Sequence, residues 1–403
     1  MWAVALALLF LQTADPYADG SKALEEGRYE AAAAAFTKAI AADPKDYAAH
    51  FHLALAYSLM HRDTDGIAEY RRTLELHPGL YEAELNGGIL LLRMKEPAEA
   101  LPLLEHAAEQ KPGEFRPRYY LAEAHLAAGA FDKAESAFQA ALSIDPKSAD
   151  AELGLAHALA RGGKLSDAAP HFRNAGTLEP KYREYLLELA QLHEDAGQTS
   201  EAMAIYREFP DNAAAQEHLG QLMLAGKKVA EALPALESAY AKDTTPANRA
   251  ALAAGYVMNG QPDRARPLLD AAVTAEPGSY DLRMMYARAL RDLKQYPAAA
   301  GQFLEAAKLK PGEPKTWTEL GSVLYMTGSL EPSLAAFDKA RVSGDNSAGV
   351  WFMRAIILDK MRQLKPALEA YQKFLSLSVG KNENQEFQAR QRSRIIQREL
   401  EKR

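Results

Sequence analysis

Proline recurs at a fixed interval of 34 residues over the first half of the chain, and the interval returns near the end. The prolines concerned are Pro44, Pro78, Pro112, Pro146 and Pro180, and later Pro277 and Pro311. A constant period of this length is typical of repeat architectures, in which each repeat is one supersecondary unit. We therefore expect one array of similar units, rather than the two or three domains that 403 residues would otherwise suggest.

Three positions of the repeat keep a constant residue size over eleven units. With the recurrent proline numbered 32, the units begin at residues 13, 47, 81, 115, 149, 183, 213, 246, 280, 314 and 348. Position 8 is always Ala or Gly: Gly20, Ala54, Gly88, Ala122, Ala156, Ala190, Gly220, Ala253, Ala287, Gly321 and Ala355. Position 20 is always small: Ala32, Gly66, Ala100, Ala134, Ala168, Ala202, Ala232, Ala265, Ala299, Ser333 and Ala367. Position 24 is always large: Phe36, Tyr70, Leu104, Phe138, Phe172, Tyr206, Leu236, Leu269, Phe303, Phe337 and Tyr371.

Residues 115–148 show why each unit is expected to be a helical hairpin. Apolar residues follow a 3.6-residue period up to Gly129, which ends the first helix because glycine adopts a left-handed turn without steric cost. A second periodic segment runs from Phe131 through Phe138 and stops before Pro146, since the residue before proline avoids the α region. Small residues at positions 8 and 20 let the two helices approach closely, and the large residue at 24 fills the space that remains.

These columns resemble the tetratricopeptide repeat family. Unit ten carries the resemblance most fully, with Trp317, Leu320, Gly321, Phe337 and Ala340. The resemblance covers about residues 13–379. It implies an all-α fold: a right-handed superhelical α-solenoid of about eleven helix hairpins, followed by a C-terminal capping helix. It names no activity, because a fold does not define a function.

The 34-residue step is broken in unit six, whose second helix is interrupted by Pro210-Asp211-Asn212 so that the step falls to 30. We interpret residues 208–213 as a seam between two sub-arrays. Residues 15–212 would hold units one to six and residues 213–379 units seven to eleven. The alternative is a harmless deletion in an outer loop.

Residues 380–403 are expected to form a polar capping helix, because the end of a repeat array needs a hydrophilic outer face. A thin apolar stripe runs along it, formed by Phe387, Ile395, Ile396 and Leu400. The alternative is a basic patch for an acidic partner or lipid headgroups, formed by Arg390, Arg392, Arg394 and Arg398.

The first fourteen residues are predicted to be a signal peptide. Residues 2–11 are uncharged and apolar, too short to span a bilayer, and match the hydrophobic segment of a secretory signal. A mature N-terminus near Asp15 is expected, which would place the protein in the periplasm or outside the cell. The alternative is an apolar helix packed on unit one, and the protein is cytoplasmic if residues 1–14 are not a signal.

The sequence contains no recognisable catalytic, cofactor-binding or metal-binding motif. There is no cysteine, which removes disulfides, thiolate zinc sites and cysteine nucleophiles together. His193-Glu194 begins a zinc-protease pattern, but Gly197 stands where the second histidine is required. The net charge of −7 argues against a nucleic-acid partner, and no transmembrane span is predicted. We expect no enzymatic activity, cofactor or metal.

The resemblance implies that the first helices of the units line a concave groove, with positions 2, 5, 9, 12 and 13 facing into it. Large apolar side chains and arginines at such positions are typical of peptide-binding surfaces. The predicted partner-binding residues are Phe51, Leu55, Arg93, Arg116, Tyr119, Arg161, Arg288, Arg291, Lys315, Tyr325 and Phe352. Two alternatives stay open: apolar members can pack between neighbouring helices, and the arginines can pair with Glu82 and Asp150.

The leading hypothesis is a non-enzymatic scaffold that binds a protein or peptide partner along this groove. The alternative is an accessory subunit of an enzyme system, such as a glycosyltransferase or a polysaccharide-secretion machine. A third hypothesis is a structural spacer that assembles by self-association.

Overall fold

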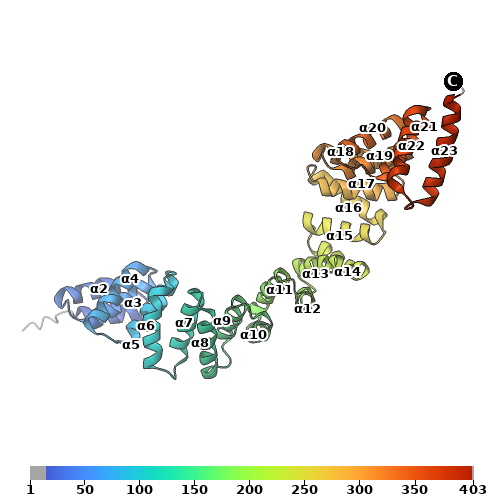
Figure 1. The fold of residues 1–403 in the computed structure, drawn as a ribbon. Helices are drawn as coiled ribbons and strands as arrows, with labels where there is room; N and C mark the ends of the chain where they lie inside the picture. The colour runs from blue at the N-terminus through green and yellow to red at the C-terminus, as the bar shows by residue number, and fades with distance from the viewer. Residues whose placement is uncertain (1–14, 402–403) are drawn as a thin grey trace, which may run out of the picture. The chain divides into compact units, whose positions relative to one another are not determined.

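The structure, a computed structural model, describes residues 15–401, and these residues form helices, turns and loops without a strand. Consecutive helices form antiparallel pairs (Figure 1). The first helices of the pairs are α1 Pro16–Glu25, α3 Tyr47–Leu59, α5 Tyr81–Arg93, α7 Phe115–Ala127, α9 Ala149–Arg161, α11 Leu186–Asp195, α13 Ala213–Ala225, α15 Pro246–Met258, α17 Tyr280–Asp292, α19 Pro314–Met326 and α21 Ala348–Lys360. The second helices are α2 Tyr29–Ala42, α4 Asp63–Leu76, α6 Pro97–Gln110, α8 Phe131–Ile144, α10 Leu165–Leu178, α12 Thr199–Tyr206, α14 Val229–Lys242, α16 Pro262–Ala275, α18 Tyr296–Leu309, α20 Leu330–Val342 and α22 Leu364–Ser378. The predicted all-α fold of about eleven hairpins is confirmed.

The turn chemistry of unit four follows the prediction. Helix α7 ends at Ala127, and Gly129 has φ of +74°, the left-handed conformation that a side chain would disfavour. Helix α8 then begins at Phe131 and ends at Ile144, two residues before Pro146. The same hairpin plan holds in each unit from the first to the eleventh.

The interior of each hairpin is built from the three columns that the repeat predicted. Every residue at positions 8, 20 and 24 is buried. Ser333, the one hydroxyl among them, donates to the carbonyl oxygen of Gly321 at 2.6 Å, so its polar group is satisfied inside the hairpin. The core is therefore a row of small, similar contacts rather than one large centre.

The described chain divides into two compact units, with the division between Ala202 and Met203. It falls within unit six, whose two α-helices, of 10 and 8 residues, together make the shortest hairpin of the described chain. The first helix of unit six starts with a 3₁₀ segment, η1 Pro180–Tyr185, before α11. Pro180 opens η1, but the prolines at the same repeat position in other units open no 3₁₀ helix within residues 15–401, so the proline alone does not account for it. The interpretation of 208–213 as a seam stays a prediction.

Helix α23 Glu383–Glu401 packs along α22 and closes the last hairpin. The predicted apolar stripe is split. Ile396 is fully buried and Leu400 packs on the same cluster, whereas Phe387 and Ile395 are 63% and 43% exposed. Arg392 donates to both carboxylate oxygens of Asp359, joining α23 to α21. One basic residue of the predicted patch therefore holds the capping helix in place.

The predicted signal peptide, residues 1–14, lies outside the described residues. Helix α1 begins directly after it, with Asp15 as the N-cap. The Asp15 side chain accepts from the backbone amides of Tyr17 at 3.0 Å and Ala18 at 3.3 Å. The first hairpin is thus capped by a residue on the retained side of the predicted cleavage point.

Replacing Phe138 by alanine should lower the free energy of unfolding by about 3–5 kcal/mol, because the fully buried ring leaves a cavity in the stack. Leu178, at the end of α10, is 41% exposed, and Leu178→Ala should cost about 1 kcal/mol or less. Urea unfolding followed by circular dichroism measures both. Equal midpoints for the two variants would contradict the assigned repeat register.

Candidate functional site

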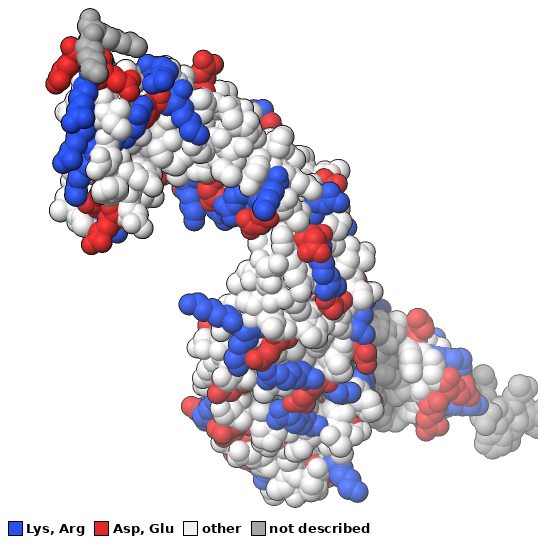
Figure 2. Space-filling model, turned by 90° about the vertical axis from the view of Figure 1, so that its right-hand side faces the viewer, with Lys and Arg blue, Asp and Glu red and all other residues white. Residues whose placement is uncertain are grey.

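The first helices of neighbouring units contact one another within each compact unit, so their exposed sides form continuous surfaces. These contacts join α3 to α5, α5 to α7 and α7 to α9 in the N-terminal unit, and α13 to α15 and α15 to α17 in the C-terminal unit. The predicted partner-binding residues lie on the first helices α3, α5, α7, α9, α17, α19 and α21. On the face shown in Figure 2, acidic and basic residues are intermixed rather than segregated by sign.

At the N-terminal end, the predicted residues make intramolecular contacts. Phe51 is half-buried and meets the ring of Tyr70 edge-on, with 5.9 Å between centroids, and Leu55 is half-buried on the same helix. The Arg93 guanidinium donates to both oxygens of Asp63, at 2.6 and 2.9 Å. Sequence reasoning offered Glu82 and Asp150 as alternative partners for the arginines and missed Asp63, which lies on the second helix of the preceding unit.

A second group, here called the Tyr119 surface, consists of Tyr119, Glu123, Asp150, His157 and Arg161 on α7 and α9. The ring of Tyr119 stacks on Phe115 at 5.5 Å, and burial raises the pKa of its hydroxyl. Burial also raises the pKa of Glu123, and the negative charge of Asp150 adds to that effect. The positive charge of Arg161 partly opposes this shift. The surface thus combines aromatic rings with a half-buried carboxyl group, a combination suited to contacts with both apolar and hydrogen-bonding groups.

In these surroundings the His157 side chain is uncharged at neutral pH. Burial, together with the charge of Arg161, lowers its pKa to about 4. Its Nε2 lies 3.6 Å from Oε2 of Glu188, a separation that would count as an ion pair only if the ring were protonated. The lowered pKa means that this contact is not an ion pair at pH 7. The ring instead packs edge-on between Phe172 at 5.3 Å and Tyr185 at 5.5 Å.

In the C-terminal unit, the surface of the first helices contains a pocket of about 360 Å³ between α15 and α17. We call it the methionine pocket. It is lined by Ala254, Val257, Met258, Tyr280, Asp281, Met284, Met285 and Arg288. Met258 is 53% exposed at its rim, and Met284 is buried at 3%. Its volume is within the range of about 300–1,000 Å³ typical of ligand pockets.

Glu319 of α19 positions the two arginines beside this pocket. Arg288 donates through Nε and Nη2 to Glu319 Oε1, at 3.1 and 2.7 Å. Arg291 donates through Nη1 to the other carboxylate oxygen at 3.2 Å. Hydrogen bonding to Glu319 raises the pKa of Arg288, so its charge is secured. The sequence predicted both arginines but gave no sign that one carboxylate orders them.

The remaining predicted residues differ in exposure. Arg116 and Lys315 are exposed. Tyr325 is half-buried, with the Lys360 ammonium 4.5 Å from its ring centroid. Phe352 is 7% exposed and packs on Phe374 with 4.7 Å between ring centroids, so most of its surface belongs to the interior of the last hairpin.

No group of three or more His, Asp or Glu side chains within residues 15–401 is placed to hold a metal ion. His193, singled out for its zinc-protease-like neighbour, has its Nδ1 2.6 Å from the side-chain oxygen of Gln198. In the same part of the chain, none of the helices combines the length and hydropathy needed to cross a membrane.

Paired helices, buried small-residue columns and a surface of adjoining first helices define an α-helical repeat protein. Comparison with protein families identifies the family of repeat proteins. A model described as tetratricopeptide repeat matches residues 17–81, 153–209, 204–249 and 250–314, and a second with that description matches 91–139 and 125–169. The chain belongs to the tetratricopeptide repeat family, as predicted, and thus to a class of scaffolds for protein interactions.

Individual relatives match over limited lengths. The Vi polysaccharide export protein VexE of Salmonella typhi is 32% identical over 83 residues, which are 20% of this chain and 12% of that protein. The chain therefore spans only a small part of this curated relative.

Among solved structures, MamA from Desulfovibrio magneticus RS-1 is 23% identical, with 40% of this chain and 92% of that chain covered and a TM-score of 0.39. MamA AMB-1 is 27% identical, with 41% and 96% covered and a TM-score of 0.39. YrrB, titled a TPR protein with an unusual peptide-binding site, is 20% identical, with 45% and 90% covered and a TM-score of 0.40.

Replacing His157 by glutamine should make the free energy of unfolding less dependent on pH in the acid range. The folded-state pKa of about 4 lies below the ordinary value of 6.5, so the unfolded chain binds the extra proton between these values and lowering the pH destabilises the fold. From pH 7.5 to 5 the unmodified protein should lose about 2 kcal/mol more unfolding free energy than the variant. Urea unfolding at both pH values measures the difference. Parallel losses in the two proteins would show that His157 is not buried in its neutral form.

Proposed function

We propose that this protein is a non-enzymatic scaffold that binds a partner segment on the surface of its first helices. The methionine pocket carries the proposal. It opens on that surface, its walls are mainly apolar, and it lies beside two arginines held by one carboxylate. An apolar side chain of the partner, buried among Met258, Met284 and Met285, would supply most of the affinity.

Physical chemistry supports the choice of a peptide rather than a rigid small molecule. Methionine side chains are flexible and polarisable, so they adapt to different apolar groups, and such surfaces are common where several partners bind. Burial contributes roughly 25 cal/mol per Å² of apolar surface. Asp281 and Arg288 stand at the pocket with opposite charges. We expect them to favour a partner segment in which charged residues of both signs flank the apolar one.

Other predicted residues would extend the contact. Arg116, Arg161 and Lys315 form no ion pair within residues 15–401 and are exposed, so acidic groups of a partner can reach them. Arg93, Arg288 and Arg291 are already paired with carboxylates, and we propose that they contribute direction and shape more than new charge pairs. Phe51, Leu55, Tyr119 and Tyr325 are half-buried and would contribute apolar edges, whereas Phe352 belongs mainly to the interior of the last hairpin and would contribute little.

A second candidate is an accessory subunit of a polysaccharide-secretion or glycosyltransferase system. The similarity to an 83-residue part of VexE favours it, since that protein is described as a polysaccharide export protein. Export of this chain would agree with it, and we keep a periplasmic or extracellular location as part of that proposal. N-terminal sequencing of the native protein tests the location. A start near Asp15 supports export, and a start at Met1 or Trp2 contradicts it.

Met258→Asp should weaken binding of peptides selected on the protein from a random peptide library by tenfold or more, since it places a charge at the pocket rim. Met326→Asp is the matched control. Both methionines occupy position 13 of their units and are exposed, at 53% and 58%, but only Met258 lines the pocket. Isothermal titration measures both affinities. The proposal is wrong if Met258→Asp binds the selected peptides as tightly as Met326→Asp does.

A further inference from the structure

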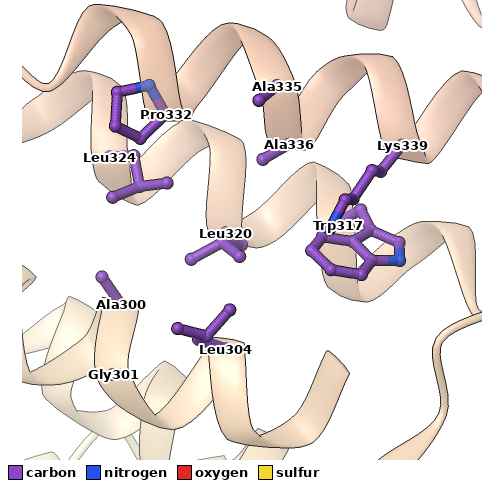
Figure 3. A pocket seen from close by; sticks show the side chains of 10 residues that line it. All are labelled: Ala300, Gly301, Leu304, Trp317, Leu320, Leu324, Pro332, Ala335, Ala336 and Lys339. Carbon is purple, nitrogen blue, oxygen red and sulfur yellow. The ribbon is translucent and has the colours of Figure 1, made fainter. Parts of the chain in front are cut away.

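A second cavity of about 360 Å³ lies between α18 and the hairpin of α19 and α20, so its walls come from two second helices and one first helix. Its lining is Ala300, Gly301, Leu304, Trp317, Leu320, Leu324, Pro332, Ala335, Ala336 and Lys339 (Figure 3). Lys339 is the only one of these with a charged side chain. None of the predicted partner-binding residues lines this cavity, so it is separate from the surface of the first helices.

Comparison within the chain shows why this place is unusual. The corresponding groove in the N-terminal unit has a volume of about 440 Å³ and is lined by the ion pair Arg71–Glu99. This ion pair joins position 25 of unit two to position 19 of unit three. Glu237 and Arg264 occupy the same two positions in units seven and eight and pair at 3.1 Å. In units nine and ten these positions are Leu304 and Pro332. The charged bridge is therefore replaced by apolar groups, and Leu304 is 43% exposed.

Few polar groups line this cavity, and they differ in whether they already have a hydrogen-bond or ion-pair partner. The indole nitrogen of Trp317 donates to the carbonyl oxygen of Pro311 at 2.8 Å, which fixes the ring and uses its only donor. The Lys339 ammonium lies 4.3 Å from the centroid of that ring and forms no ion pair within residues 15–401. Figure 3 shows the side chains of Trp317 and Lys339 side by side at one end of the cavity, with Ala300, Leu304 and Leu324 further along it.

These features define the ligand chemistry. The walls are helices, whose backbone donors and acceptors are used within the helices, so a buried polar group of a ligand would find no partner except Lys339. A hydrocarbon chain has no such requirement. An anionic group at one end of that chain would meet the unpaired ammonium.

We propose that this cavity binds a free single-chain aliphatic carboxylate, with its chain against Leu304, Leu320 and Trp317 and its carboxylate at Lys339. The inference is independent of the partner surface of the first helices. It assigns the protein a second kind of ligand, in a cavity that none of the predicted partner-binding residues lines.

The test uses the full chain and 2-bromododecanoate, whose bromine lies next to the carboxylate and therefore beside Trp317 in the proposed orientation, where it quenches the tryptophan that it contacts. The chain has three tryptophans, Trp2, Trp317 and Trp351. Quenching should saturate, persist in Trp351→Phe and disappear in Trp317→Phe. Unbrominated alkanoates should compete, with affinity rising by up to about fourfold for each added CH₂ until the cavity is filled. Persistence of saturable quenching in Trp317→Phe would overturn the assignment.

Gly301→Leu separates binding from folding. A Cβ at Gly301 would meet no heavy atom within 4 Å, and leucine is a better helix former than glycine, so the variant should melt at an unchanged or higher temperature. Its side chain should fill the cavity and reduce dodecanoate binding by tenfold or more. A variant that still binds with unchanged affinity contradicts the proposed site.

Lys339→Gln tests the carboxylate contact, with Lys365→Gln, an exposed lysine at the start of α22, as the matched control. Loss of the ammonium should weaken dodecanoate binding about tenfold, while the control and Met258→Asp bind normally. Equal affinity for dodecanoate and dodecylammonium would overturn the role of Lys339. The proposal of a free ligand would also be wrong if the fluorescence of Trp317 changed with phosphatidylglycerol–phosphatidylcholine vesicles but not with free dodecanoate. That result would identify a membrane surface as the source of the aliphatic chain.

Discussion

The close approach of a small residue to a large one inside each hairpin is the contact on which the structure depends. In unit ten, a Cβ added at Gly321 would lie 2.9 Å from the ring of Phe337, closer than real atoms come. The ring therefore occupies the space that a side chain at position 8 would need. Because each hairpin has only this thin interior, stability comes from stacking on its neighbours, and the fold is a sum of similar local interfaces.

The sequence was sufficient for this part because the contact is periodic. Size at positions 8, 20 and 24 predicted which residues are buried in all eleven units, and Gly129 and Pro146 predicted where the helices of unit four end. The 3₁₀ opening of unit six was not predicted. It depends on how closely α10 approaches η1 near Gly176, where a Cβ would lie 2.9 Å from the backbone of Arg183.

The candidate site was predictable in position but not in its interactions. The repeat register placed Arg288 and Arg291 on the surface of the first helices, and the same register places Met258 there. What it could not give is the partner of each charge. Glu319 and Asp63 reach the arginines from neighbouring units, and that choice depends on side-chain conformations that no periodic pattern encodes. The shifted pKa values of the Tyr119 surface likewise depend on burial by side chains of other elements, such as Phe172 and Tyr185 beside His157.

The charged bridges between second helices have a consequence for assembly of the array. Eleven hairpins with nearly the same interior are prone to stacking out of order, a recognised failure of repeat proteins. The bridges differ in polarity: Arg71 faces Glu99, whereas Glu237 faces Arg264. If unit two packed directly against unit eight, Arg71 would lie opposite Arg264, and the two positive charges would repel each other. The opposite signs of these two bridges thus disfavour that one exchanged pairing and favour the encoded neighbours of units two and eight.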